Sequence, residues 1–161
     1  MKHLALTIAL CLLTFTASGQ SVRDKDLKPL EGQTWIGTLT YRDYGSGKKT
    51  LIKSNLSVQK KSGDVWSFSY VYPDEPKANS SSEVILAAEG KMLNGQIVAS
   101  REKTKDGRLE IVTTEEGDDD GKKALFRYTY SISRKVFEIR KDVQYIGETI
   151  WLERNTYRWR R

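Results

Sequence analysis

The chain has 161 residues, with 27 Lys and Arg against 21 Asp and Glu, and its only histidine and only cysteine are His3 and Cys11. A chain of this length is expected to form a single domain. If its first 19 residues are removed, as argued next, no imidazole and no thiol remain. This excludes a Ser-His-Asp triad, a cysteine nucleophile, disulfides and ordinary zinc sites.

Residues 1–19 have the three-part pattern of a secretory signal peptide. A positive start is followed by an apolar run over residues 4–15 and by small residues up to Gly19. The run is too short to cross a membrane, which takes about 20 apolar residues; a buried N-terminal helix is the alternative. We expect an exported protein, periplasmic or extracellular, that is cleaved after Gly19. Residues 20–31 would form a polar lead-in and residues 32–161 the folded domain.

From Trp35 onward the chain alternates apolar and polar residues with period two between turn residues, which is typical of short antiparallel strands. No long amphipathic helix is indicated. Nine or ten short strands with regular turns predict an all-β fold, a sandwich or a barrel. The expected strands cover residues 35–44, 51–59, 65–72, 84–88, 96–103, 108–115, 124–133, 136–143 and 148–155.

Three segments need comment. Residues 84–88 fit a short helix or a strand, and the β-branched pair Val84-Ile85 favours the strand. Asn94-Gly95 predicts a tight hairpin turn. Residues 116–123 resemble the start of an EF-hand loop, but Arg127 stands at the twelfth position, where a bidentate Glu is required. We therefore expect a solvated acidic loop there and no metal site.

The start of the first strand carries a recognisable pattern. Gly32 and Gly37 flank Trp35, and a basic residue, Arg154, lies in the last expected strand. This resembles the lipocalin and fatty-acid-binding superfamily, the calycins, although the spacing here is Gly-x-x-Trp. The resemblance implies a single antiparallel up-and-down β-barrel of about 8–10 strands. It also implies that Trp35 and Arg154 meet where the first and last strands close the barrel.

Two expected strands carry aromatic residues in phase. Residues two apart share one face of a strand, and the opposite face of residues 65–72 carries Ser67 and Ser69, so the aromatic faces should point into the barrel. A barrel of this size is often filled by side chains. However, buried tyrosine hydroxyls need hydrogen-bond partners, which favours a cavity with water or a polar-tipped ligand. The inward set is Trp66, Phe68, Tyr70, Tyr72, Phe126, Tyr128 and Tyr130.

These features predict an exported protein that binds a small amphiphilic or aromatic molecule in its interior through those seven residues, without a cofactor. The alternative is a non-catalytic envelope interaction module with a filled barrel. A weaker third possibility is an enzyme that uses Tyr, Arg and Glu without histidine.

The basic residues are scattered along the sequence, and export argues against a nucleic-acid partner. The C-terminal segment Arg158–Arg161 is basic and aromatic. It could contact an anionic surface or a protein, or it could be a frayed end.

Overall fold

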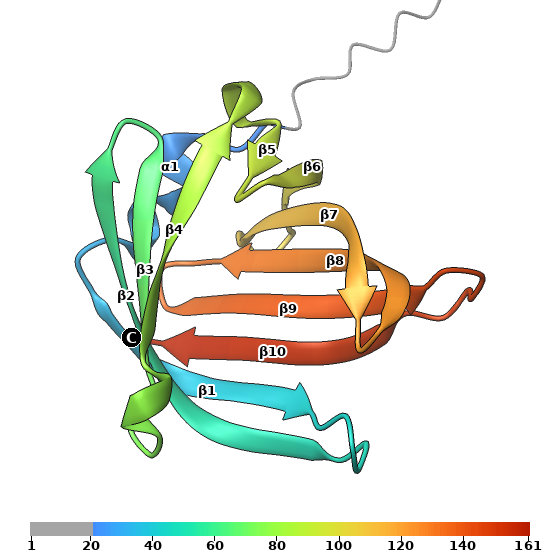
Figure 1. Cartoon of the computed structure of the whole chain (residues 1–161). Helices are drawn as coiled ribbons and strands as arrows, with labels where there is room; N and C mark the ends of the chain where they lie inside the picture. The colour runs from blue at the N-terminus through green and yellow to red at the C-terminus, as the bar shows by residue number, and fades with distance from the viewer. Residues whose placement is uncertain (1–20) are drawn as a thin grey trace, which may run out of the picture.

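The computed structural model describes residues 21–161, so the predicted signal peptide and its cleavage point lie outside the described residues. The predicted all-β fold is confirmed: ten antiparallel strands form a closed up-and-down barrel in which β1 pairs with β10 (Figure 1). The strands are β1 (Thr34–Arg42), β2 (Lys49–Ser62), β3 (Val65–Val71), β4 (Ser80–Ala87), β5 (Met92–Leu93), β6 (Gln96–Lys103), β7 (Leu109–Asp119), β8 (Lys122–Ile132), β9 (Val136–Tyr145) and β10 (Leu152–Arg160). Such a barrel is compatible with a calycin-like fold.

The polar lead-in closes one end of the barrel, which we call the closed end. It forms the helix α1 (Asp24–Leu27) and the 3-10 turn η1 (Lys28–Leu30), and Leu27 and Leu30 are buried against the core. The Asp26 carboxylate accepts two hydrogen bonds from the Arg101 guanidinium of β6, at 2.7 and 2.6 Å, and one from the Arg23 N–H. This ion pair fixes the helix to the barrel wall. Two further 3-10 turns are η2 (Pro76–Ala78) and η3 (Ala88–Gly90).

The half of the barrel next to this end is a packed aromatic core. The rings of Phe137 and Trp159 stack with their centroids 5.3 Å apart, and Trp35 meets Phe137 edge-on at 6.3 Å. The Trp35 indole N–H donates to the Leu30 carbonyl at 3.0 Å. Trp35, Trp66, Phe68, Phe137 and Trp159 are each at most 1% exposed. This half of the interior is filled by side chains.

The first and last strands approach each other closely at Gly37, which pairs with Trp159. A Cβ atom on Gly37 would lie 2.0 Å from the carbonyl oxygen of Arg158 and 2.7 Å from the Trp159 Cα. Real Cβ atoms do not approach backbone so closely, so the barrel closes here only because residue 37 has no side chain.

Most predicted elements are confirmed, but the last strand is shifted and one element is wrong. The strand predicted over residues 148–155 begins only at Leu152 and continues to Arg160. Val84 to Ala87 belong to a strand, as predicted, whereas Ala88 begins the 3-10 turn η3. Asn94 and Gly95 have φ of 54° and 80° in a tight turn.

The predicted acidic loop over residues 116–123 is instead strand, apart from the two-residue turn at Asp120 and Gly121. Asp118 lies opposite Lys123 and Asp119 opposite Lys122 in the ladder, and neither carboxylate forms an ion pair with the lysine it faces. The Asp118 carboxylate instead accepts a hydrogen bond from the Gly121 N–H at 2.7 Å, which stabilises a tight two-residue turn between long strands.

The C-terminal segment is ordered and not frayed. It continues β10 to Arg160, Trp159 is fully buried, and Arg158 pairs with Glu138 of β9 at 3.7 Å. Among the helices of residues 21–161, none has the length and apolar character needed to span a bilayer.

Candidate functional site

All seven predicted aromatic residues point into the barrel, but they fall into different groups. Trp66 and Phe68 belong to the packed core, and Phe126 packs with Ala124 and Val143 in a separate small cluster. Tyr70 and Tyr128 are partly buried, while Tyr72 and Tyr130 are buried. Tyr130 belongs to the same core cluster as Trp66 and Phe68, and Tyr70 and Tyr128 pack against it. The end of the barrel that α1 does not cover is called the open end, and Tyr70 and Tyr128 lie between the core and this end.

The region between the core and the open end contains a cavity of about 440 Å³. Its wall is apolar on the core side and polar towards the open end. The side chains that line it are Phe68, Tyr70, Ser82, Val84, Asn94, Gln96, Glu115, Tyr128, Tyr130, Ile139, Lys141, Asn155 and Tyr157. A second hollow of about 490 Å³ adjoins it at the open end and shares Lys141 and Asn155; Tyr72 lines this one.

The protein itself provides partners for most of the tyrosine hydroxyls. Tyr128 donates to Glu115 at 2.9 Å, Tyr130 donates to the side-chain oxygen of Gln96 at 3.3 Å, and the hydroxyls of Tyr72 and Tyr157 lie 2.8 Å apart. The expectation that a dry interior would leave these hydroxyls unpaired is therefore wrong for Tyr72, Tyr128 and Tyr130. The network instead fixes the rings as flat walls of the cavity.

Burial keeps four tyrosines of the cavity wall neutral over the physiological pH range: Tyr70, Tyr128, Tyr130 and Tyr157. Burial raises the pKa of Tyr70 to about 12. Burial, and next the hydrogen bond to Glu115, raises the pKa of Tyr128 well above its ordinary value, and burial also raises the pKa of Tyr130 and Tyr157. A neutral phenol offers a hydrogen bond but no negative charge.

Lys141 places a cation inside the barrel. It projects from β9 into the cavity, and its Nζ lies 3.7 Å from the centroid of the Phe126 ring and 5.6 Å from that of Tyr128. Within residues 21–161 its side chain makes no hydrogen bond and no ion pair, and burial lowers its pKa. Glu115 lines the same cavity but is not within ion-pair distance. The ammonium group thus faces the cavity with its hydrogen-bonding capacity unused.

A second polar cluster lies at the open end around Asp119, which is 2% exposed. Its carboxylate accepts hydrogen bonds from Tyr44 at 2.6 Å, from Tyr145 at 2.9 Å and from Arg154. Burial by itself would raise the pKa of Asp119, but these hydrogen bonds outweigh it and hold that pKa below its ordinary value. The cluster ties the β1–β2 loop to the β7–β8 hairpin.

The predicted contact between Trp35 and Arg154 is wrong, although the first and last strands do pair. Arg154 lies at a bulge between Glu153 and Asn155, at the opposite end of β10 from the residues that pair near Trp35. Its guanidinium bonds Asp119 and lies 4.1 Å from the Tyr44 ring centroid. The cation over Trp35 is Arg161, at 5.2 Å.

We therefore expect Arg161→Ala to lower the free energy of unfolding by about 0.5–1 kcal/mol, the value of a cation over an indole at an exposed site. Urea unfolding followed by tryptophan fluorescence measures it. Arg160→Ala is the control, because Arg160 is also exposed and makes no ion pair within the described residues. An equal loss in both variants would contradict the stacking contribution.

The barrel ladder is interrupted beside the cavity. β5 pairs with β4 only at Leu86 and Ala87, and β6 pairs with β7 only as far as Thr114. The first part of β4 therefore does not pair with β5, and the last part of β7 does not pair with β6. Ser82, Asn94 and Glu115 line the cavity at this interruption. The interruption of the ladder therefore adjoins the cavity.

Sequence reasoning missed Lys141, Glu115, Gln96 and Asn155. The signal for Lys141 was present, because it is in phase with the inward residues Ile139 and Val143 of one strand. Glu115 is likewise in phase with Ile111 and Thr113. A charged residue at an inward position of a strand is the pattern that would have revealed both.

No protein-family model matches the chain, and no curated protein matches it either. In the part of the chain that the structure describes, no group of three or more His, Cys, Asp or Glu side chains is placed to hold a metal ion.

Proposed function

We propose that the protein is a binding protein for a small amphiphilic or aromatic molecule, held in the tyrosine-lined cavity. The observation that carries the proposal is the unpaired Lys141 ammonium inside that cavity. Lys141 is partly buried, and removing a cation from water is unfavourable unless the cation finds a partner. A ligand with an anionic or strongly accepting group at Lys141 and Asn155 would supply the missing partner.

The shape and chemistry of the wall support this ligand class. Binding sites for small molecules are mostly apolar cavities of about 300–1,000 Å³ with a few placed polar groups. The rings of Tyr70 and Tyr157, 5.5 Å apart, and the side chains of Phe68 and Ile139 offer flat apolar contact. A planar group would lie among them, with its polar end towards Lys141.

The decisive first experiment is native mass spectrometry of the protein purified from its own host, which reveals a co-purifying molecule. The second is a titration with an aromatic anion, 8-anilinonaphthalene-1-sulfonate, beside its uncharged analogue N-phenyl-1-naphthylamine. Saturable binding of both probes is expected if the cavity accepts aromatic molecules.

We expect Lys141→Met to weaken binding of the anionic probe by about tenfold or more and to leave the neutral probe nearly unaffected. A hydrogen bond to a charged group contributes about 1.5–3 kcal/mol, and 1.4 kcal/mol corresponds to a factor of ten. Lys123→Met, at an exposed lysine of the β7–β8 hairpin, is the matched control. Unchanged affinity of the anionic probe in Lys141→Met, with the fold intact, would refute the role of Lys141.

Two other functions remain as proposals of lower rank. A filled interaction module is supported by the packed closed half of the barrel but not by the cavity. Acid–base catalysis is supported by Glu115, Tyr128 and Lys141 around one cavity. Incubating the co-purified molecule with the protein separates binding from catalysis, because an enzyme converts it and a binding protein returns it unchanged.

Export and a specific relation to lipocalins also belong to this proposal. Export rests on residues 1–19, and the intact mass of the protein recovered outside the cytoplasm tests it. A relation to lipocalins rests on the glycines around Trp35 and on the barrel.

A further inference from the structure

The net positive charge of the protein is concentrated at the closed end. An up-and-down barrel brings every second turn to the same end, and here those segments are 21–33, 60–65, 88–91, 103–108, 133–135 and 160–161. Together they carry thirteen Lys or Arg against six Asp or Glu. The open-end segments, 42–49, 72–79, 118–123 and 146–154, carry seven against eight. The two ends therefore differ strongly in charge.

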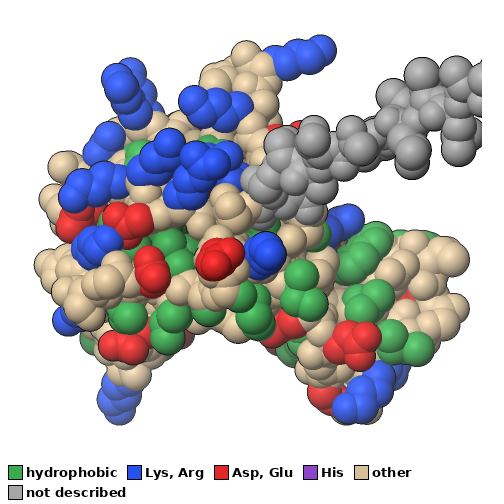
Figure 2. Space-filling view, turned by 90° about the horizontal axis from the view of Figure 1, so that it is seen from above, with side chains coloured by type: hydrophobic (Ala, Val, Ile, Leu, Met, Phe, Trp, Pro, Cys, Tyr) green, Lys and Arg blue, Asp and Glu red, His purple; other side chains and the backbone are tan. Residues whose placement is uncertain are grey.

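The excess cations of the closed end are exposed and free of ion pairs within residues 21–161. Four of its six acidic residues are already neutralised, by Lys28, Lys60, Arg101 and Arg108. Figure 2, which looks down on the side where α1 and the β2–β3 hairpin lie, shows Lys and Arg side chains gathered in its upper left part. Every segment of this end contributes at least one exposed, unpaired cation: Lys25, Lys61, Lys91, Lys105, Lys135 and Arg160.

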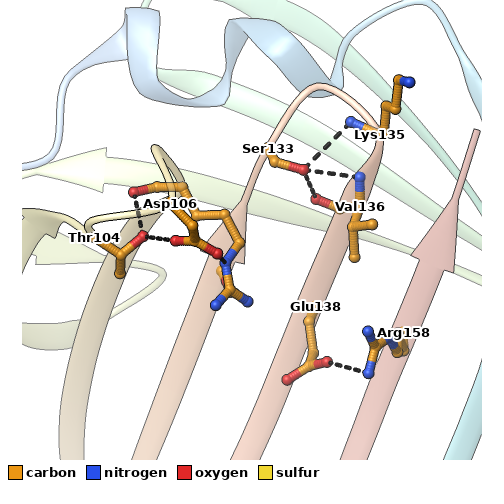
Figure 3. A network of polar contacts seen from close by, with 9 residues as sticks. Thr104, Asp106, Ser133, Lys135, Val136, Glu138 and Arg158 are labelled. Carbon is orange, nitrogen blue, oxygen red and sulfur yellow. Dashed lines mark hydrogen bonds and ion pairs between the residues drawn. The ribbon is translucent and has the colours of Figure 1, made fainter.

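The turns that carry these cations are held by local hydrogen bonds. The Ser133 hydroxyl accepts from the N–H groups of Lys135 and Val136, at 3.3 and 2.9 Å, and donates to the Val136 carbonyl at 2.9 Å. Figure 3 shows the Lys135 side chain pointing away from this turn, whereas Arg158 on the barrel wall is directed to Glu138. Lys135 is thus presented outward, whereas Arg158 on the wall is paired.

The two ends act separately on a charged surface. A nine-residue strand such as β10 spans about 30 Å at roughly 3.3 Å per residue. The Debye length at physiological ionic strength is about 8 Å. A negatively charged surface at the closed end is therefore attracted by the cations of that end. The acidic residues at the open end are too far away to repel it.

The chemistry of this face distinguishes a lipid surface from a nucleic acid. Trp35, Trp66 and Trp159 are fully buried, and Tyr44, the aromatic residue among the exposed large hydrophobic ones, is at the open end. Among residues 21–161, the closed end has no exposed ring on which a base could stack, as single-strand binders use. Dispersed cations on several turn tips fit a flat array of anionic headgroups.

We infer that the closed end of the barrel is a docking face for anionic phospholipid surfaces. Docking through this face holds the open end and the cavity away from the lipid. The face would orient the protein at a membrane without inserting into it.

The test is co-sedimentation with phosphatidylcholine vesicles that contain or lack phosphatidylglycerol, for two charge-reversal variants with the same net charge. The closed-end variant combines Lys25→Glu, Lys61→Glu and Lys105→Glu, and the open-end control combines Lys48→Glu, Lys77→Glu and Lys123→Glu. All six lysines are exposed and make no ion pair within the described residues. The unmodified protein should bind only the vesicles with phosphatidylglycerol, and salt should weaken that binding.

We expect the closed-end variant to lose on the order of a hundredfold in affinity, since each cation near an anionic surface contributes about 1 kcal/mol and 1.4 kcal/mol is tenfold. The control should lose far less. Equal losses in the two variants would overturn the oriented docking and leave a net-charge effect. Absence of binding to phosphatidylglycerol, or tighter binding to a single-stranded oligonucleotide at the same salt, would also overturn it.

Discussion

Replacement of Gly37 by alanine is expected to lower the free energy of unfolding by about 3 kcal/mol, the upper range for overpacking a closed structure. The added Cβ would lie 2.0 Å from the Arg158 carbonyl oxygen, and that atom belongs to backbone that cannot rotate away. β1 and β10 must separate locally to make room, which breaks the ladder that closes the barrel. Urea unfolding followed by circular dichroism measures the loss.

Gly45→Ala is the matched control, because Gly45 is exposed in the β1–β2 loop and a Cβ there meets only the Asp43 carboxylate at 3.6 Å. Its effect should stay within about 0.5 kcal/mol, as is usual for surface substitutions. A Gly37 variant as stable as the control would show that the two strands do not approach as closely as described.

Asp26→Asn is expected to destabilise the protein by about 3 kcal/mol at neutral pH. Asp26 is 6% exposed and holds α1 to β6 through two hydrogen bonds to Arg101. Removal of one partner of a buried ion pair leaves the other charge uncompensated, which costs about 3–5 kcal/mol. Asp106→Asn is the control, because its pair with Arg108 is exposed and such pairs contribute about 0–1 kcal/mol.

The same carboxylate makes stability depend on pH. Burial by itself would raise the pKa of Asp26, but the hydrogen bonds from Arg101 and the Arg23 N–H outweigh it, and its pKa lies below the ordinary value of 3.8. Below that value the unfolded chain takes up the proton before the folded protein does, so the contribution of Asp26 is complete above about pH 4 and is lost on further acidification. The unfolding free energy of Asp26→Asn should therefore fall less steeply with acid than that of the unmodified protein. Parallel curves would contradict the assignment.

Alternation alone was sufficient to predict most strands and the direction of their side chains. Tyr70, Tyr128 and Tyr130 are inward as predicted, because period two fixes the face once one side of a strand is polar. The alternation pattern gave the wrong direction for Arg154, where a bulge interrupts it. An extra residue in β10 breaks its pairing with β9, and the Arg154 side chain turns towards Asp119. The sequence contains no local sign of that bulge.

The basic face could not be predicted for a different reason. Its cations come from six segments separated by whole strands, so they look scattered in the sequence. Lys25 and Arg160 share one end only because the barrel returns the chain to it. Similarly, Lys141 was recognisable as an inward lysine. Its lack of an ion-pair partner, however, depends on where Tyr128 of β8 holds Glu115 and where Tyr44 of the β1–β2 loop holds Asp119.

The pairing of β1 with β10 also determines when the barrel can close during synthesis of the chain. Ile36 pairs with Arg160 almost at the end of the chain, so the ribosome must release nearly every residue before the ring can form. Contacts between residues so distant in sequence form late, because the loop-closure entropy must be overcome first. Until then β1 lacks its second neighbour and Trp35 lacks the cover of Arg161, so the nascent chain remains open and accessible to chaperones. Closure of a barrel built in this way is therefore expected to be a late, long-range step of folding, and the edge of β1 stays free for other contacts until β10 reaches it.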